Sequence, residues 1–189
     1  MSSRCIQIYS VCAGWIDGCI AEGNMKYYFN YSYLHDFLSD LMTALLAVHG
    51  EWAADERKEC FYAVLEPGKD FWRLSLDNGI LEIKISQKYI NTDGDEISEE
   101  VCFRFDDKLF LNDFIAEMKA LLKKYGLLGY KTEWEYEFPL SLLLKLADIS
   151  DGNNRLKLSD VLSEENMGLD SVMSDFSAEV EILNELFIK

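Results

Sequence analysis

Histidine is scarce in this sequence, which contains only His35 and His49 among its 189 residues. Histidine is the usual general base beside a serine or cysteine nucleophile, so a nucleophilic triad has few ways to form. His35 follows the predicted start of a helix, and His49 falls at the end of the same helix, where the helix dipole favours positive charge. We therefore assign both histidines to surface or capping roles.

The signature motifs of several enzyme classes are also absent. The sequence contains no G-x-G-x-x-G or G-x-x-x-x-G-K-[ST] phosphate loop, no H-E-x-x-H zinc motif and no G-x-S-x-G nucleophile motif. Two acidic stretches, at 93–96 and 148–160, resemble parts of calcium loops, but the spacing of oxygen ligands is wrong and Arg155 falls among the ligand positions of the second. The sequence thus predicts no catalytic residue, no metal site and no cofactor.

Closely spaced cysteine pairs are missing as well, since the five cysteines form no C-x-x-C motif. Structural zinc sites are usually built from such pairs. Free thiols behave as small apolar side chains, and an odd number of them fits a reducing compartment. We expect buried, reduced thiols in a cytoplasmic protein at Cys5, Cys12, Cys19, Cys60 and Cys102.

Long apolar runs are lacking: no segment approaches the ~18 uninterrupted apolar residues that a membrane span needs. The first residues contain a short apolar stretch that Gln7 and Ser10 interrupt, whereas a secretory signal has a longer one and a small-residue cleavage site. We interpret residues 4–12 as a strand and expect no membrane interaction.

Positive charge is in short supply. The chain has 18 lysine and arginine residues against 34 aspartate and glutamate residues, and its formal net charge is −16. Such a field repels nucleic-acid backbones and attracts cationic partners. Acidity that serves only solubility is the alternative explanation. The composition therefore favours a basic protein partner and argues against nucleic-acid binding.

The patterns that are present predict an α+β fold. Apolar residues recur every three or four positions over 34–48 and 109–125, which predicts amphipathic helices, the first capped by Ser32. Pro139 suits the first turn of a third helix. We expect an antiparallel sheet of about six or seven strands with two or three helices packed on it. Turn signals between alternating runs predict hairpins at Ala13-Gly14, Gly23-Asn24 and Asn78-Gly79.

The end of the chain differs in composition, because residues 151–189 hold nine acidic residues against three basic ones. We divide the chain into an α+β domain at 1–149 and an acidic C-terminal extension at 150–189. The extension contains a predicted helix at 171–187, which either docks on the domain or binds another chain. Docking is favoured because an isolated helix of this length is marginal in water. Its apolar seam is formed by Val172, Phe176, Val180, Leu183 and Phe187.

The stretch KTEWEYEFPL at 131–140 alternates acidic and aromatic residues. In an extended conformation its carboxylates line one face and its rings the other. A helix would still place Trp134 and Phe138 on one face, but the extended interpretation is preferred. Neighbouring carboxylates repel each other more strongly at low dielectric, so burial without cations is unfavourable. We expect these carboxylates to face water, basic side chains of the same protein or a basic partner.

Two patterns of turns and aromatic residues resemble those of small bacterial proteins similar to the immunity proteins that accompany polymorphic toxins. The patterns are E-P-G-x-x-x-W, from Glu66 to Trp72, and Y-G-x-x-G-Y-x-x-x-W-x-x-x-F-P, from Tyr125 to Pro139. The resemblance spans roughly 34–146 and concerns fold more than activity, so no functional residue is transferred. It implies a compact acidic domain that neutralises a basic toxin.

These observations predict a non-catalytic acidic protein-binding module of the immunity type, steered to its partner by charge and held by aromatic anchors. Two alternatives stay open. One is an oligomeric scaffold or adaptor that uses the helix at 171–187, and the other is a carboxylate-dependent enzyme with Glu66 and Asp70 as candidates. Oligomeric state is not predicted. The predicted partner-binding residues are Asp93, Asp95, Glu96, Glu99, Glu100, Glu133, Glu135 and Glu137.

Overall fold

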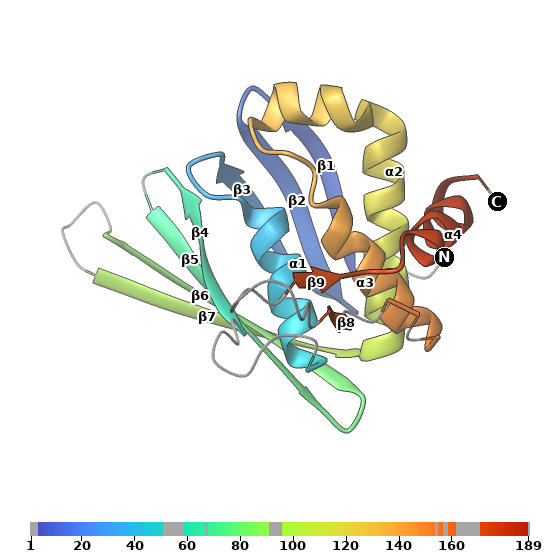
Figure 1. Ribbon diagram of the computed structural model, residues 1–189. Helices are drawn as coiled ribbons and strands as arrows, with labels where there is room; N and C mark the ends of the chain where they lie inside the picture. Colours follow the sequence, from blue (N-terminus) through green and yellow to red (C-terminus); the bar gives the residue numbers. More distant parts are fainter. Residues whose placement is uncertain are drawn as a thin grey trace.

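The computed structural model describes residues 4–50, 59–66, 68–90, 96–153, 155–156, 159–161 and 171–188. Within these residues the chain forms two larger antiparallel sheets, a short two-stranded ribbon and four helices (Figure 1). The predicted α+β class is confirmed. The seven strands of the larger sheets divide into three and four, however, and do not form one continuous sheet.

The three-stranded sheet has the order β1-β2-β3, and the four-stranded sheet has the order β4-β5-β6-β7. The first contains β1 (Ile6–Cys12), β2 (Trp15–Glu22) and β3 (Met25–Ser32). The second contains β4 (Cys60–Leu65), β5 (Gly68–Asp77), β6 (Ile80–Ile90) and β7 (Glu96–Asp106). The ribbon pairs β8 (Ser159–Val161) with β9 (Ser171–Met173). The helices are α1 (Phe37–Val48), α2 (Asp107–Trp134), α3 (Leu140–Asp151) and α4 (Phe176–Phe187).

All three predicted hairpins are confirmed, since β1 pairs with β2, β2 with β3, and β5 with β6. Asn78 and Gly79 have φ angles of 49° and 77°, and positive φ at both central residues is what a type I′ turn requires. Gly14, in the turn between β1 and β2, is needed because Tyr33 lies close to it. A Cβ atom at this position would lie 2.5 Å from the Tyr33 ring, so a larger residue would displace the segment that follows β3.

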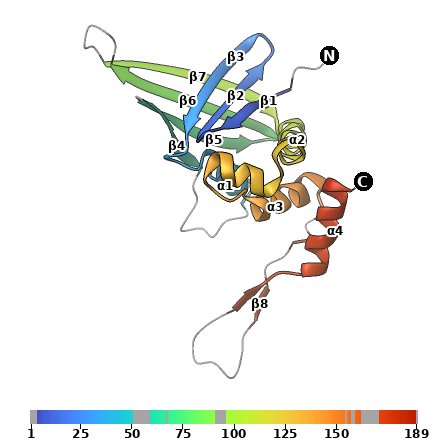
Figure 2. The same ribbon diagram turned by 90° about the horizontal axis from the view of Figure 1, so that it is seen from above.

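Helix α1 lies in the centre of the molecule and is apolar on most of its surface. It contacts β4 and β5 on one side and α3 on the other, and Figure 2 shows α1 and α3 on the same side of the sheets. A helix covered on several sides needs a wide apolar surface. The fully buried residues of α1 are Phe37, Leu38, Leu41, Met42, Ala44, Leu45 and Leu46.

The start of α1 differs from the prediction, because its N-cap is Asp36 and not Ser32. Ser32 is the last residue of β3 and is buried. The amide of Tyr33 donates to the carbonyl oxygen of Gly14 at 2.8 Å. This bond extends the contact between the chain after β3 and the β1–β2 turn. The helix therefore begins about one turn later than predicted.

The extended conformation predicted for 131–140 is wrong for 131–134, which are helical, and 135–139 form no strand. Helix α2 continues to Trp134 after a break at Gly126, where φ is 66° and ψ is 174°, and Glu135 ends it in the left-handed conformation. Tyr130 and Trp134 are both fully buried, because residues four apart share one face of a helix. Phe138 is also buried, whereas Tyr136 is exposed. In an extended strand, Trp134, Tyr136 and Phe138 would all have been buried on one face.

The C-terminal helix docks in cis on α3. Ile182 and Leu186 are buried in the main hydrophobic core, and Leu183 and Phe187 pack against it. The predicted seam is therefore correct only for its second half, since Phe176 is 72% exposed and Val180 is 37% exposed. The helix also begins later than predicted, because 171–173 form β9.

All five cysteines are free, as expected, but only two are buried. Cys5 and Cys19 lie inside, whereas Cys12 and Cys60 are exposed and Cys102 is intermediate. Cys12 ends β1, and Cys60 begins the edge strand β4, so neither is covered by a second layer. Among the described residues, no helix combines the length and the apolar character needed to cross a membrane.

Candidate functional site

The predicted partner-binding residues fall into two groups on different elements. Glu99 and Glu100 lie on β7 and are exposed. Glu100 accepts a hydrogen bond from the hydroxyl of Ser86 at 3.0 Å. The backbone of Glu96 begins β7, but its side chain is outside the described part, as are Asp93 and Asp95 entirely.

The second group lies around the end of α2. The Glu133 carboxylate accepts a hydrogen bond from the backbone amide of Ala13 at 3.0 Å, and its carbonyl oxygen accepts one from Gly14 at 2.7 Å. Glu137 pairs with Lys131. Glu135 is exposed at the helix cap. Figure 1 shows this end of α2 far from β7, so the structure does not bring the two predicted groups together.

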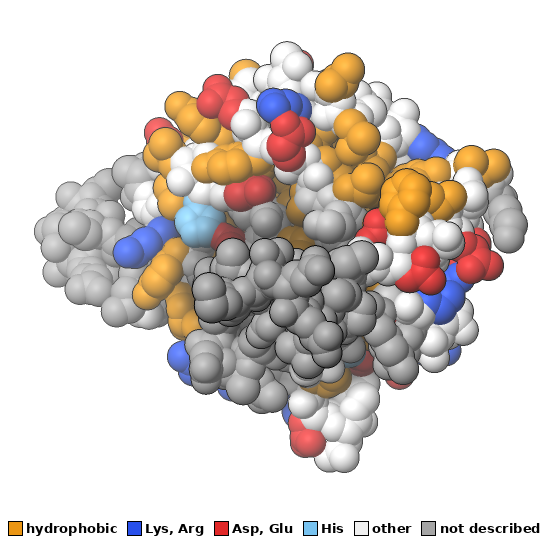
Figure 3. All heavy atoms as spheres, in the orientation of Figure 1, with side chains coloured by type: hydrophobic (Ala, Val, Ile, Leu, Met, Phe, Trp, Pro, Cys, Tyr) orange, Lys and Arg blue, Asp and Glu red, His pale blue; other side chains and the backbone are white. Residues whose placement is uncertain are grey.

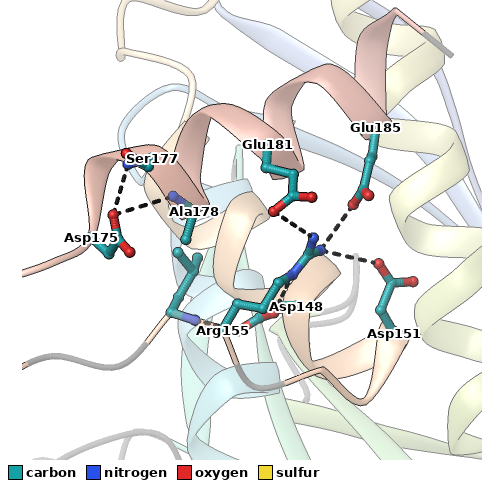
Figure 4. A network of polar contacts seen from close by, with 9 residues as sticks. Asp148, Asp151, Arg155, Asp175, Ser177, Ala178, Glu181 and Glu185 are labelled. Atoms are coloured by element: carbon teal, nitrogen blue, oxygen red, sulfur yellow. Dashed lines mark hydrogen bonds and ion pairs between the residues drawn. The ribbon is translucent and has the colours of Figure 1, made fainter.

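Carboxylates do converge at a place that the sequence did not indicate. Arg155 follows α3, and its guanidinium meets side chains from both α3 and α4 (Figure 4). Its Nη2 lies 2.9 Å from Glu185 Oε2 and 3.6 Å from Asp151 Oδ2. Its Nε lies 3.4 Å from Asp148 Oδ1, and its Nη1 lies 3.7 Å from Glu181 Oε2. We call these five residues the Arg155 network.

The Arg155 network carries surplus negative charge, because four carboxylates share one guanidinium. Hydrogen bonding to Glu185 raises the pKa of Arg155 above its ordinary value, so the guanidinium keeps its charge. Asp148 is buried and also accepts the backbone amide of Leu156 at 2.7 Å. The network thus holds α4 on α3 with its inner carboxylates and exposes its outer ones, since Glu181 is 63% exposed.

The outward side of α4 adds apolar residues to this charge. Phe176, Glu179 and Val180 are spaced by three and four residues and share one helix face. Asp175 caps the helix by accepting the amide of Ser177 at 2.9 Å. Figure 3 shows apolar and acidic side chains gathered together over α4. We call Asp175, Phe176, Glu179, Val180 and Glu181 the α4 acidic surface.

A polar cavity of about 320 Å³ lies where α2, α3 and α4 meet, beside the Arg155 network. Asn112, Asp151 and Glu185 are among its lining residues. The hydroxyl of Ser150 donates to Asn112 Oδ1 at 2.8 Å across the α2–α3 contact. The cavity and the network share Asp151 and Glu185, and Lys119 of α2 also lines the cavity, so this recess holds charges of both signs.

In the sequence, Arg155 stands out only as a residue that interrupts a possible calcium loop. Its position was still informative, because it is a single arginine in a turn between acidic segments. A guanidinium in such a place can form charge-assisted hydrogen bonds with the carboxylates around it, and only one other cation, Lys157, is near it in the sequence. Which carboxylates Arg155 meets depends on the docking of α4, and that docking could not be derived from spacing along the chain.

The two carboxylates considered for an enzyme occupy different environments. Asp70 on β5 is fully buried, whereas Glu66 is exposed. The hydroxyls of Tyr27 and Tyr31 donate to Asp70 Oδ2 at 2.5 Å and 2.6 Å. Burial raises the pKa of the Asp70 carboxyl above its ordinary value, although the tyrosine hydrogen bonds oppose this effect.

Trp72 completes this arrangement, since its indole N–H donates to the Tyr31 hydroxyl at 2.8 Å. Tyr27 and Tyr31 belong to β3, and Asp70 and Trp72 belong to β5. The hydrogen bonds therefore join the two sheets through their cores. Within the described residues, no three histidine, cysteine, aspartate or glutamate side chains are grouped so that they could hold a metal ion.

Comparison with known proteins adds no relative. No protein-family model matches the chain, and neither the curated proteins nor the solved structures contain a significant match.

Proposed function

We propose that this protein is a non-catalytic binding module that captures a basic protein partner on the α4 acidic surface. The observation that carries the proposal is the exposure of an aromatic residue, Phe176, which is 72% exposed at the start of α4. Asp175, Glu179 and Glu181 lie near it on the same helix, and Glu181 is one of four carboxylates around Arg155. The exposed ring is an anchor for the partner, and the carboxylates around it supply the complementary charge.

This combination matches the anatomy of protein interfaces, in which an apolar centre is surrounded by a polar rim. A few buried aromatic anchors typically carry most of the binding energy. Surplus charge around them steers the encounter and excludes partners of the same sign. The net charge of −16 extends this steering over the whole protein.

The α4 acidic surface is also held in place before a partner arrives. Ile182 and Leu186 are buried on the opposite side of the helix, and Arg155 links Glu185 to Asp148 of α3. A partner therefore does not have to order this helix when it binds. Preorganisation of this kind raises affinity because less conformational entropy is lost on association.

Neutralisation of a toxin is the specific form of this function that the sequence resemblance implies. The exposed carboxylates Glu99, Glu100 and Glu135 remain a predicted contact set for the same basic partner. Glu133 and Glu137 each bind a group of this protein, as do Glu100 and the carboxylates of the α4 acidic surface. The α4 acidic surface differs from that set in having an exposed aromatic residue at its centre.

Self-association through α4 is the alternative that the exposed half of the seam raises. Two copies that paired through Phe176 and Val180 would bring Glu179 and Glu181 of each copy close to those of the other. Like charges placed across an interface cost several kcal/mol. The charge of this surface therefore favours a basic partner over a second copy.

The proposal is tested with the tagged full-length protein as bait in an extract of its native host. The wild type should retain a basic protein in a salt-sensitive complex. The double charge reversal E179K/E181K should reduce retention by about tenfold or more, since each rim charge adds to steering and to complementarity. The matched control is E99K/E135K, which reverses two exposed carboxylates outside α4.

Each outcome decides the question once circular dichroism has shown that both variants are folded. Loss of the partner from E179K/E181K alone supports the α4 acidic surface. Loss from E99K/E135K alone moves the contact to the residues predicted from sequence and overturns our assignment. Retention of only acidic proteins, or of nothing, contradicts the binding function itself. Light scattering on the purified protein tests the self-association alternative.

A further inference from the structure

Part of the outer face of the four-stranded sheet carries more basic than acidic side chains, although the protein as a whole is acidic. Residues paired across the strands form three neighbouring rows on this face: Val64-Lys69-Lys88-Ser98, Tyr62-Phe71-Ser86-Glu100 and Cys60-Arg73-Lys84-Cys102. Among the side chains that the structure describes, the three rows contain the basic residues Lys69, Arg73 and Lys84 and one acidic residue, Glu100. Glu100 is already engaged by the Ser86 hydroxyl, and Lys84 pairs with Glu82 of the adjoining row.

The middle of these rows is hollowed. A cavity of about 450 Å³ is lined by Tyr62, Lys69, Phe71, Ser86 and Ser98, and we call it the sheet hollow. Its volume lies within the range of roughly 300–1,000 Å³ that is usual for small-molecule sites. Aromatic walls with a small number of polar groups are also usual for such sites.

Two aromatic rings form one wall of the sheet hollow. The ring centroids of Tyr62 and Phe71 are 4.9 Å apart, with 46° between the ring planes. Tyr62 is 48% exposed. The rings face away from the main core, which lies on the other side of the sheet with Trp72 and Ile85. The pair therefore contributes little to the core and offers an apolar surface to a ligand.

Each ring has a cation over its face. Lys69 Nζ lies 4.6 Å from the centroid of Tyr62, and the Arg73 guanidinium lies 5.4 Å from the centroid of Phe71. Among the described residues, neither cation forms an ion pair with a carboxylate. Both cations are exposed, so they can turn towards an anion without breaking a salt bridge.

We propose that the sheet hollow binds a small anionic ligand that carries a planar ring. The ring packs on Tyr62 and Phe71, and the anionic group, a phosphate or a carboxylate, is bound by Lys69, which lines the hollow, with Arg73 as a second cation next to Phe71. The hydroxyls of Ser86 and Ser98 supply polar contacts at the opposite wall. This site is on a different face from the α4 acidic surface, and it does not depend on the function proposed above.

A small anion suits the site better than a nucleic-acid strand. The net charge of −16 repels each phosphate of an extended polyanion, whereas only the local charge of the three rows acts strongly on a single bound anion. The volume of the hollow, about 450 Å³, also suits one small molecule.

Calorimetric titration of the full-length protein tests the site with two anionic probes, adenosine 5′-monophosphate and indole-3-acetate. Adenosine and indole-3-acetamide are their neutral counterparts. At least one anionic probe should bind saturably with a Kd below about 1 mM, as expected for a ligand of this size. Its neutral counterpart should bind about tenfold more weakly, because the contact with the cations is lost. The better of the two probes distinguishes a phosphate from a carboxylate ligand.

Substitutions then locate the binding. Lys69→Ala and Tyr62→Ala should each weaken binding of the anionic probe by about tenfold. The matched control is Lys124→Ala, which removes another cation beside a ring, 4.8 Å from Tyr125 on α2, and should leave binding unchanged. Absence of saturable binding for both anionic probes overturns the proposal. So does equal affinity for the charged and neutral forms, or an equal effect of the substitution at Lys124.

Discussion

The indole N–H of Trp134 donates a hydrogen bond to Asp36 Oδ1 at 3.1 Å, and thereby joins the end of α2 to the residue that caps α1. Trp134 is fully buried. Desolvation raises the pKa of the Asp36 carboxyl, while the bond from Trp134 acts in the opposite direction. The aromatic residue most prominent in the KTEWEYEFPL stretch therefore connects two helices and does not lie on a sheet.

This relationship predicts the cost of substitutions at Trp134. Trp134→Phe removes the donor to Asp36 and should lower the free energy of unfolding by about 1–3 kcal/mol, as expected when a partly buried acceptor loses its partner. Trp134→Ala should cost about 3–5 kcal/mol, because a large cavity is added. Urea denaturation followed by circular dichroism measures both. Tyr136→Phe is the control, and an equal loss for Tyr136→Phe and Trp134→Phe would contradict the prediction.

The burial of Asp70 leads us to expect that the free energy of unfolding depends on pH. The pKa of Asp70 is raised in the folded state, chiefly by burial, so the folded protein holds this proton to higher pH than the unfolded chain does. The free energy of unfolding contributed by Asp70 therefore falls as pH rises from about 3.9, the ordinary pKa of an aspartate, through the folded-state pKa.

Asp70→Asn removes this titration and keeps an oxygen that can accept from Tyr27 and Tyr31. The stability of the variant relative to wild type should therefore improve as pH is raised from 4 to 7. Denaturation at several pH values measures the difference, and Asp77→Asn, at an exposed carboxylate, is the control. A difference that is independent of pH, or that moves in the other direction, would show that burial does not govern Asp70.

The ion pairs of Arg155 should contribute to the stability of the contact between α3 and α4. Arg155→Ala leaves the buried Asp148 without its cation and removes the link to Glu185. The loss of hydrogen bonds between charged groups should lower the free energy of unfolding by about 1.5–3 kcal/mol. It should also loosen α4, which limited proteolysis detects as earlier cleavage before Phe176.

The matched control for Arg155 is Lys131→Ala, which removes the exposed ion pair with Glu137. Exposed pairs contribute little to stability, so this variant should unfold and be cleaved like the wild type. If Arg155→Ala also behaved like the wild type, the apolar contacts of Ile182 and Leu186 would be sufficient to hold α4.

The residues of the two proposed sites show where sequence analysis reached its limit. Lys69, Arg73 and Tyr62 lie on two strands, and their register brings them together. The overall acidity of the chain pointed away from a positively charged face, because composition averages over the whole surface. The described members of the acidic set chosen from local clustering are, in contrast, divided between β7 and the end of α2.

By itself the sequence determined the elements whose signals are local. Asn78-Gly79 specifies its turn because few residues tolerate positive φ, and Pro139 marks the start of α3 because its ring fits only the first turn of a helix. Tertiary structure alone decided that the strands divide into two sheets, that 131–134 is helical and that Arg155 lies among four carboxylates. These outcomes depend on which surfaces bury one another, and burial joins residues that are distant along the chain.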